Sequence, residues 1–400
     1  MKKILFVINT MGQAGAETAL LELLRKLEGC GCEIFLYVLM GQGEMIEQIP
    51  SYVRLLNTEF CSLSVLTKDG RCRMVKTVLK AFFKNGGYCK KLWYLAGILA
   101  VMIRERRIRI SKLLWRIVSE GAVRFAIDFD AAVAWLEGGS AYYVAEHVKA
   151  RKKSAFIHID YENAGYTRAM DQDCWKQFHR IFAVSQEVKA HFQEFYPEYA
   201  CKTTVFNNML DVEGIHLKAG ETGGFLDGYD GIRLLSVGRL SYQKGYDIAL
   251  EAMKLLKKSG YQVRWYVLGE GDQRRKLEKK IRALKLKEDF ILLGAVSNPY
   301  PYFAQTDIYV HTARYEGKSI AVQEAQMLGC AIVASDCNGN REEITDGSDG
   351  ILCRLDPQAI ADGIAKLIES KEWRMELGKT AGKKHLPKEK RAEEILKLLA

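Results

Sequence analysis

The chain has 400 residues, of which 48% are hydrophobic and 27% are charged, and its formal net charge is +10. This length exceeds what one hydrophobic core usually spans, so two domains are expected. The composition contains no low-complexity tract, which excludes a disordered or fibrous protein.

The N-terminal segment predicts a β-strand over Lys3 to Asn9. Its five-residue apolar run is too short for the core of a signal peptide, and no small-residue cleavage site follows it. Ten cysteines are scattered without CxxC pairs, and Cys30 and Cys32 have no second pair or histidine cluster. These features predict a cytosolic protein with reduced thiols and no zinc site.

A glycine-bearing loop, "GQAGAE" at Gly12 to Glu17, joins the first predicted strand to a helix, and "CEIFLYVLM" predicts the next strand. This alternation is typical of a parallel sheet covered by helices. Gly12 and Gly15 would let backbone amides approach a ligand closely. The spacing is neither GxGxxG nor a P-loop, so a plain tight turn is the alternative.

Residues 68–124 form a basic segment, with fifteen Lys and Arg against three acids. Helical spacing gives its first part, "RCRMVKTVLKAFFK", two different faces. The apolar face has Met74, Val75, Val78, Leu79, Phe82 and Phe83. The basic face has Arg73, Lys76, Lys80 and Lys84. The longest uncharged run that follows, Leu92 to Ile103, has 12 residues, fewer than the roughly 20 that a spanning helix needs. The segment predicts a helix on an anionic membrane surface, with an ordinary surface helical pair as the alternative. No recognisable nucleic-acid-binding module accompanies it.

The stretch "AFIHID" predicts a strand in which Phe156, His158 and Asp160 share one face. His158 and Asp160 would end that strand together, as a candidate site pair rather than a structural histidine. The "DFD" of Asp128 to Asp130 matches a metal-binding DxD motif, but it precedes "AAVAW" and is interpreted as the entrance to a buried strand. No metal site is predicted.

A domain boundary is expected where Gly, Asn and Asp gather between Thr204 and Ile232, before a new strand begins at "IRLLSVGRL". We predict an N-terminal domain over 1–205, joined by a C-terminal helix over 385–400, and a C-terminal domain over 206–384. The predicted fold class is α/β, with two doubly wound Rossmann-like domains that face each other across a cleft.

Two stretches of the second domain carry candidate binding residues. In "SVGRLSYQKG" a strand ends at Gly238 and brings Arg239 and Lys244 to its carboxyl edge, where two cations would hold a diphosphate. The alternative is a pair of exposed surface cations.

The second stretch is "YEGKSIAVQEAQMLG", which predicts a helix from near Ser319 that ends before Gly329. Glu324 would lie in an apolar row and would need a hydrogen-bond donor, while Glu316 precedes the helix and would accept hydrogen bonds from a sugar. A solvated helix face is the alternative.

Together these motifs resemble those of the retaining glycosyltransferases of the large bacterial family 4, which have the GT-B fold. The matching residues are Gly15, Ala16 and Glu17; Gly238, Arg239, Lys244 and Gly245; "LGEG" at Leu268 to Gly271; and the E-x7-E of Glu316 and Glu324. The likeness covers the first twenty residues and nearly all of Val205 to Ser370. It is weak from about Leu55 to Arg124.

The resemblance implies that Arg239 and Lys244 hold the donor diphosphate, that Glu324 contacts the ribose and that Glu316 contacts the transferred sugar. Further donor contacts are implied for residues whose backbone lines the phosphates, namely Gly15, Gly238, Gly317, Lys318, Ser319 and Ile320. His158 corresponds to a family histidine near the reaction centre. Two departures are "AGAE", which lacks two adjacent glycines, and "EGKSI" in place of "EGFGL", which would add the Lys318 cation near the donor.

The predicted activity is retaining, metal-independent hexosyl transfer from a nucleotide diphosphate sugar, foremost a UDP-sugar, without a permanently bound cofactor. The acceptor would be a hydroxyl of a lipid-linked or other saccharide in the synthesis of capsule, exopolysaccharide or lipopolysaccharide, at the inner face of the cell membrane. Asp160 would position or deprotonate that hydroxyl. Three alternatives stay open: a soluble acceptor, a sugar-nucleotide 2-epimerase of the same architecture, and a non-enzymatic nucleotide-sugar-binding scaffold.

Overall fold

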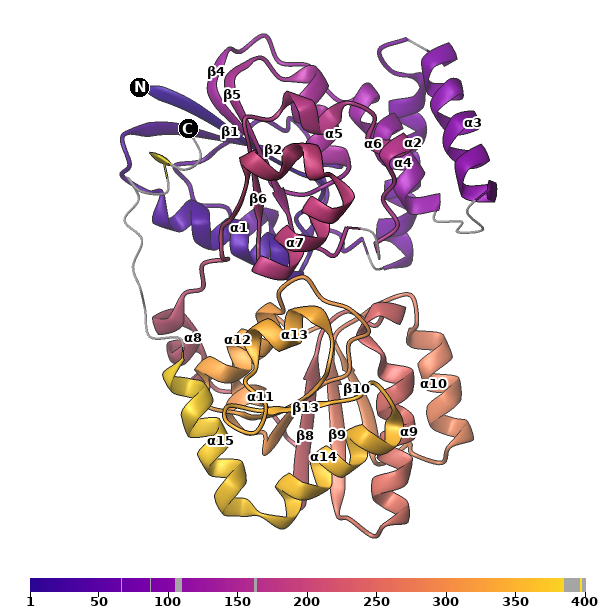
Figure 1. Cartoon of the computed structure of the whole chain (residues 1–400), viewed down its shortest axis with the longest axis vertical. Helices are drawn as coiled ribbons and strands as arrows, with labels where there is room; N and C mark the ends of the chain where they lie inside the picture. The colour runs from indigo at the N-terminus through magenta and orange to yellow at the C-terminus, as the bar shows by residue number, and fades with distance from the viewer. Residues whose placement is uncertain (66, 87, 105–109, 162–163, 385–395, 398–400) are drawn as a thin grey trace. The chain divides into compact units, whose positions relative to one another are not determined.

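A computed structural model describes residues 1–65, 67–86, 88–104, 110–161, 164–384 and 396–397 (Figure 1). The chain divides into two compact units, the first formed by Met1–Leu210 and the second beginning at Asp211. The boundary predicted after residue 205 lies just before this division. Most of the C-terminal helix predicted over 385–400 lies outside the described residues.

The first unit is built on a parallel sheet of seven described strands in the order β3-β2-β1-β4-β5-β6-β7. Their bounds are β1 Lys2–Ile8, β2 Cys32–Val38, β3 Arg54–Leu55, β4 Phe129–Ala134, β5 Ala150–Ile157, β6 Arg180–Ala183 and β7 Thr203–Val205. The strand order reverses at the neighbours β1 and β4, where Ile4 pairs with Ala131. Ligands of such sheets bind beyond the carboxyl ends of the strands at this kind of reversal.

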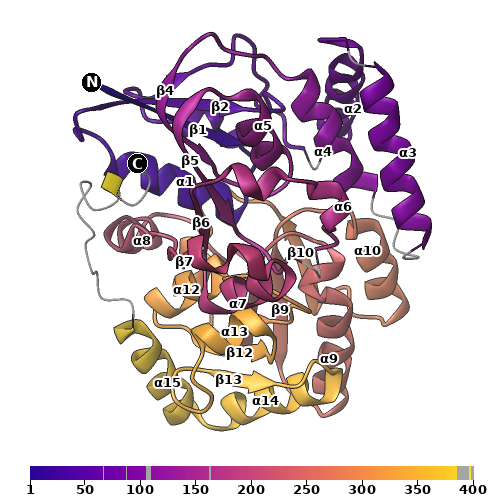
Figure 2. The ribbon, with the colours of Figure 1, turned by 45° about the horizontal axis from the view of Figure 1, so that its top comes forward.

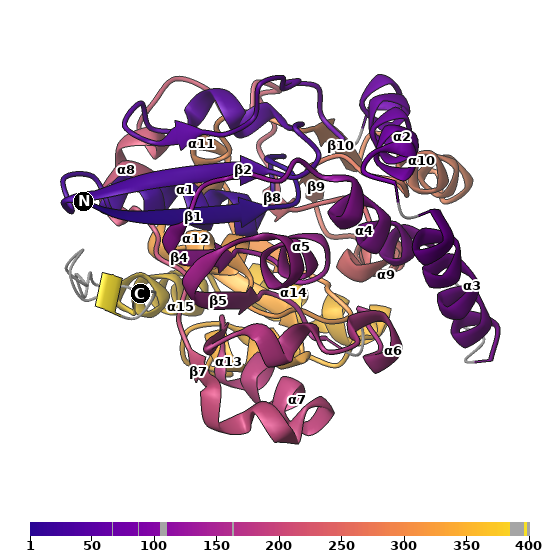
Figure 3. The ribbon, with the colours of Figure 1, turned by 90° about the horizontal axis from the view of Figure 1, so that it is seen from above.

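Helices cover the sheet of the first unit and form a separate group at one end of it (Figure 2). The covering elements are α1 Gly15–Lys26, α5 Gly139–His147, α6 Arg168–Asp171 and α7 Gln186–Phe195, with the 3-10 turns η1 Glu44–Gln48, η2 Cys174–Gln177 and η3 Pro197–Lys202. The end group is α2 Lys68–Phe83, α3 Tyr88–Arg104 and α4 Ile110–Gly121, in which α3 is outermost (Figure 3).

Two expectations for the first unit change. The strand β5 stops at Ile157, so the alternation that placed Asp160 beside His158 does not extend to Asp160. The apolar face of α2 is divided, because Met74 and Val78 pack against the core of this unit while other residues of that face are exposed. The "DFD" stretch is the start of buried β4, as predicted.

The second unit has a parallel sheet of six described strands in the order β10-β9-β8-β11-β12-β13. The strands are β8 Ile232–Val237, β9 Val263–Leu268, β10 Phe290–Gly294, β11 Ile308–His311, β12 Ala331–Ser335 and β13 Ile351–Cys353. The helices are α8 Val212–Ala219, η4 Tyr242–Lys244, α9 Tyr246–Lys258, α10 Arg274–Ala283, α11 Tyr300–Ala304, α12 Ile320–Met327, α13 Asn338–Glu343, α14 Pro357–Glu369 and α15 Lys371–Lys383.

The order of this second sheet reverses at β8 and β11, where Ile308 pairs with Leu234. The loops after these two strands therefore emerge side by side, although 72 positions separate Lys244 from Glu316. Both units have the predicted doubly wound α/β class. Among the described residues, no helix combines the length and the apolar character that crossing a membrane requires.

Candidate functional site

A glycine holds the two neighbouring loops of the second unit together. Gly245 follows η4 with φ of 66°, and a Cβ at this position would lie 2.0 Å from the carbonyl oxygen of Thr312. Only glycine permits both the left-handed backbone and the close approach. The Thr312 hydroxyl donates to the Lys244 carbonyl at 3.0 Å, so Lys244 and the residues after β11 have a fixed spacing.

Half-buried Lys244 and buried Glu316 form an ion pair in which Nζ lies 2.5 Å from Oε1. Gln243 Nε2 also donates to Glu316 Oε2, at 3.4 Å. Burial by itself would raise the pKa of Glu316, but Lys244 and His311 outweigh it and lower this pKa to about 2. Glu316 is therefore an ionised hydrogen-bond acceptor at neutral pH.

His311, the last residue of β11, was not predicted as a site residue. Its Nε2 lies 3.3 Å from Glu316 Oε1, and its Nδ1 lies 3.2 Å from the Tyr309 hydroxyl. Burial and the neighbouring Lys244 lower the pKa of His311, so the ring is neutral. Because an ionised carboxylate only accepts, Nε2 carries the proton and Nδ1 accepts from Tyr309. The sequence did contain a signal for His311, because this residue ends "DIYVH" and therefore lies at the carboxyl end of a predicted strand.

The helix α12 has the predicted ends. Ser319 is its N-cap and accepts from the Val322 N–H, and Gly329 follows it with φ of 70°. Glu324 is buried in this helix and accepts from the Tyr300 hydroxyl at 3.0 Å, which supplies the donor that the sequence required. Burial raises the pKa of Glu324 to about 7, against the opposing effects of Tyr300 and Lys218.

The Lys318 side chain lies in an unexpected environment. Its Nζ pairs with Glu343 Oε1 of α13 at 3.1 Å; the Glu343 side chain is buried, and the Lys318 side chain is 10% exposed. The expected extra cation near a donor is therefore already neutralised by a carboxylate of its own unit. A Cβ on Gly339, also in α13, would lie 2.9 Å from the Gly317 carbonyl oxygen, so α13 supports the turn that precedes α12.

Arg239 is exposed directly after Gly238 and β8. Among the described residues it forms no ion pair with a carboxylate. Its neighbour across the loop, Lys244, is paired and mostly buried. One cation of the predicted pair is thus open to water and the other is held by Glu316.

The candidate residues of the first unit follow the ends of three strands. Gly15 begins α1 after β1, Glu137 follows β4, and His158 follows β5. The His158 N–H donates to Glu137 Oε2 at 3.1 Å, and its ring packs against Trp135 with centroids 5.3 Å apart. Desolvation lowers the pKa of His158 to about 3, so this imidazole is neutral.

Asp160 pairs with His191 of α7, whose Nδ1 lies 3.0 Å from Oδ2. The expected partnership of Asp160 with His158 is therefore wrong, because β5 ends before either residue. Sequence reasoning also missed Glu137, which follows β4 in "WLEGG". That position too could have been found as the carboxyl end of a predicted strand.

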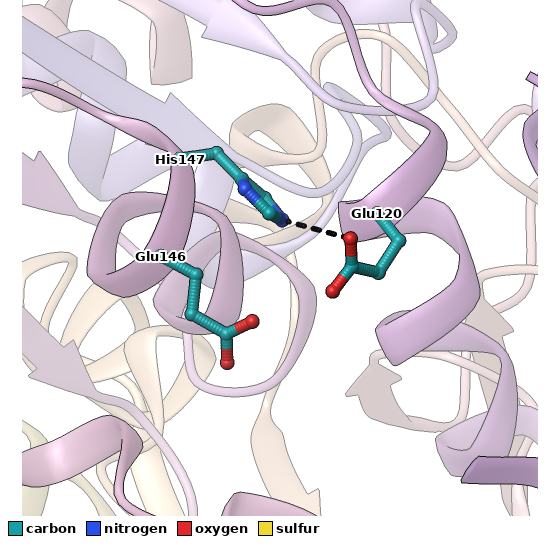
Figure 4. A group of neighbouring side chains, drawn as sticks. All are labelled: Glu120, Glu146 and His147. Carbon is teal, nitrogen blue, oxygen red and sulfur yellow. Dashed lines mark ion pairs between the residues drawn. The ribbon is translucent and has the colours of Figure 1, made fainter. Parts of the chain in front are cut away.

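Glu120, Glu146 and His147 form a cluster with ligand atoms within 4.8 Å of one another (Figure 4). His147 Nε2 lies 3.6 Å from Glu120 Oε2. Two guanidinium groups neutralise the carboxylates, since Arg116 pairs with Glu146 and Arg124 lies 3.5 Å from Glu120. A cation would compete with these arginines, so the cluster is an ion-pair network at the ends of α4 and α5.

Residues 229–384 match the family described as "Glycosyl transferases group 1". One relative is the N-acetylgalactosamine-N,N'-diacetylbacillosaminyl-diphospho-undecaprenol 4-alpha-N-acetylgalactosaminyltransferase of Campylobacter jejuni, 31% identical over 43% of this chain and 46% of the relative. Another is the amylovoran biosynthesis glycosyltransferase AmsD of Erwinia amylovora, 26% identical over 37% of this chain and 42% of the relative. The matches span less than half of these curated relatives.

Two solved structures resemble nearly the whole chain. Anabaena HepE, solved in complex with UDP, has a TM-score of 0.64 at 17% identity, over 96% of this chain and 94% of HepE. A TarM variant of S. aureus, also solved with UDP, has a TM-score of 0.66 at 13% identity, over 100% of this chain and 99% of TarM. These likenesses show the fold. Residues 229–384 thus match the model of the group 1 glycosyl transferases, and the chain as a whole has the GT-B fold.

Proposed function

We propose that the protein is a glycosyltransferase that moves a sugar from a nucleotide diphosphate sugar, foremost a UDP-sugar, to a hydroxyl of a saccharide acceptor. The observation that carries the proposal is the Lys244, Glu316 and His311 cluster at the carboxyl ends of β8 and β11. The group 1 family match and the UDP bound by HepE and TarM support it. The relatives named for glycan synthesis support a role in polysaccharide or glycan assembly.

In this proposal the donor diphosphate is held by Arg239, Lys244 and the backbone N–H groups of residues 317–320 at the start of α12. The ionised Glu316 keeps Lys244 in position and accepts from hydroxyls of the transferred sugar. Glu324 accepts from the ribose hydroxyls. As the sugar leaves, negative charge grows on the diphosphate, and the two cations stabilise it without a metal ion.

The remaining assignments concern the first unit. Neutral His158 would lie near the transferred sugar as a hydrogen-bonding group. Asp160, which pairs with His191, would position or deprotonate the acceptor hydroxyl. We propose retention of configuration from the resemblance of the E-x7-E motif. The acceptor would be lipid-linked, by analogy with the diphospho-undecaprenol in the name of the Campylobacter relative, and the protein would work at the inner face of the cell membrane.

A thermal-shift panel of UDP-, GDP- and ADP-sugars tests the donor assignment. A donor at about 100 times its Kd should stabilise the protein by about 2.7 kcal/mol. Incubation with the stabilising donor, with and without saccharide acceptors, then separates transfer from other activities. An isomerised donor without acceptor would identify an epimerase, and binding with no turnover would identify a scaffold. Stabilisation by none of the sugars would refute the proposal.

A further inference from the structure

The outward side of α2 carries a row of apolar side chains. Val75, Leu79 and Phe83 are four residues apart, so they align along one side of the helix, with exposed fractions of 55%, 54% and 66%. Met74 and Val78 pack inward against the core of the first unit. Folding therefore uses one half of the apolar face of α2 and leaves the other half in water.

The row continues onto α3. The ring centroid of Phe83 lies 6.4 Å from that of Tyr88, the first residue of α3. Farther along α3, Leu92, Trp93 and Leu99 are exposed, Trp93 to 66%. An apolar surface that extends over two helices is typical of an interaction site.

A buried lysine fixes these helices as a hairpin. Lys91 of α3 donates from Nζ, at 2.6 to 2.9 Å, to three carbonyl oxygens at the end of α2, those of Ala81, Phe82 and Lys84. Asn85, in the connection, donates from Nδ2 to two carbonyl oxygens at the end of α4, those of Glu120 and Ala122. The ends of three helices are thus bonded together, and the apolar row has a defined position on them.

Cations lie beside this row. Lys76 and Lys80 each follow a row residue by one position, and both are exposed, as are Arg73 and Lys84. Two other described cations of the basic segment serve the fold instead. Lys91 caps α2, and Arg116 is buried and donates to the Met170 carbonyl oxygen at 2.9 Å. Among the side chains of the basic segment that the structure describes, exposed cations thus gather on α2, next to the apolar row.

We propose that the α2–α3 hairpin docks on an anionic lipid bilayer. Val75, Leu79 and Phe83 enter the boundary of the headgroups and acyl chains, and Lys76 and Lys80 contact headgroup phosphates. The exposed apolar side chains match the acyl-chain layer of such a surface, and the flanking lysines match its layer of anionic headgroups. A purely electrostatic contact would not require the apolar row. The inference rests on the proposed function only for the membrane location, for which it names the contact surface, and it does not depend on the donor or the acceptor.

Co-sedimentation of the full chain with phosphatidylcholine vesicles, with and without phosphatidylglycerol, tests the docking. The wild type should bind the anionic vesicles and bind neutral ones at least about tenfold more weakly. Leu79→Ser/Phe83→Ser and Lys76→Glu/Lys80→Glu should each weaken binding to anionic vesicles at least about tenfold. Both pairs are exposed, so circular dichroism should show the wild-type fold.

Matched controls lie in the second unit. Leu226→Ser/Met375→Ser removes two exposed apolar side chains, and Lys371→Glu/Lys379→Glu makes the same change in charge on exposed α15 residues. Both should bind like the wild type. Raising the salt from about 0.1 M to about 1 M shortens the Debye length from about 10 Å to about 3 Å. This should weaken wild-type binding without abolishing it, because the inserted row is insensitive to screening.

Equal recovery with neutral and anionic vesicles would overturn the inference, as would paired α2 variants that bind as well as their controls. Light scattering addresses a second copy of the chain as the partner. A dimer that Leu79→Ser/Phe83→Ser dissociates, in a protein that binds no vesicles, would assign the row to self-association and overturn the lipid docking.

Discussion

At the scale of single residues, the second unit holds two carboxylates that differ in ionisation at neutral pH. Glu316 is ionised because Lys244 and His311 outweigh its burial, with a pKa of about 2. Glu324 has one hydroxyl donor and a pKa of about 7. Both acids belong to the E-x7-E motif. They are the same type of residue, but their environments give them different pKa values.

Lys244→Ala should lower kcat/KM about a hundredfold, or ~3 kcal/mol, because one charge that stabilises the leaving diphosphate is lost. The exposed α9 variant Lys254→Ala is the control. Lys244→Ala also leaves Glu316 buried without its cation, so urea unfolding should show lower stability. Lys244→Ala/Glu316→Gln should regain stability and stay inactive. Near-normal turnover of Lys244→Ala would exclude Lys244 from the donor site.

The affinity for a UDP-sugar should rise with pH until about pH 7 and then level off. Ribose hydroxyls donate to the ionised form of Glu324, so below its pKa of about 7 binding must first remove a proton. Isothermal titration calorimetry should show a loss of up to about tenfold per pH unit below the pKa. Glu324→Gln should remove this dependence, and Tyr300→Phe should move it to higher pH. A flat profile for the wild type would rule out the ribose role of Glu324.

At the scale of elements, the pair of Lys318 and Glu343 connects the turn before α12 to α13. Removing one member of a buried pair leaves the other charge uncompensated and costs about 3 to 5 kcal/mol. Urea unfolding of Lys318→Met should show a loss of this order, and the exchange Lys318→Glu/Glu343→Lys should recover part of it.

The exposed pair of Arg341 and Asp336 provides the control for the Lys318 variants. Arg341→Met should change stability little, since exposed ion pairs contribute at most about 1 kcal/mol. Equal effects of Lys318→Met and Arg341→Met would mean that the buried pair does not hold the two elements together.

Some features of these elements could be predicted from the sequence, and others could not. Strands β1 and β8 and both ends of α12 were predictable because apolar runs, Ser319 and Gly329 are local signals. The roles of Lys318 and Tyr300 were not, because their partners are distant in sequence and meet them only after folding. Asp160 was misplaced for a related reason: period-2 alternation gives no signal of where a strand ends.

At the scale of the whole molecule, the donor nucleotide and the bilayer contact different segments in our proposals, namely the loops after β8 and β11 and the α2–α3 hairpin. UDP-sugar should therefore slow amide hydrogen exchange in residues 238–245 and 316–321 of the second unit and leave α2 and α3 unchanged. Anionic vesicles should slow exchange in α2 and α3 and leave the second unit unchanged. Protection of α2 by the sugar nucleotide alone would contradict this division.

The two-domain α/β class was predictable from strand and helix alternation, whereas the division of the basic segment into buried and exposed cations required the folded structure.

The buried ammonium of Lys91 has a consequence for chemical labelling. Its three carbonyl contacts shield it from amine-reactive reagents, whereas Lys76 and Lys80, in the same hairpin, are open to them. A lysine footprint read by mass spectrometry would thus contain its own internal reference. Lys91 should stay unmodified for as long as the hairpin is folded, and the loss of Lys76 and Lys80 labelling on a bilayer would report contact alone.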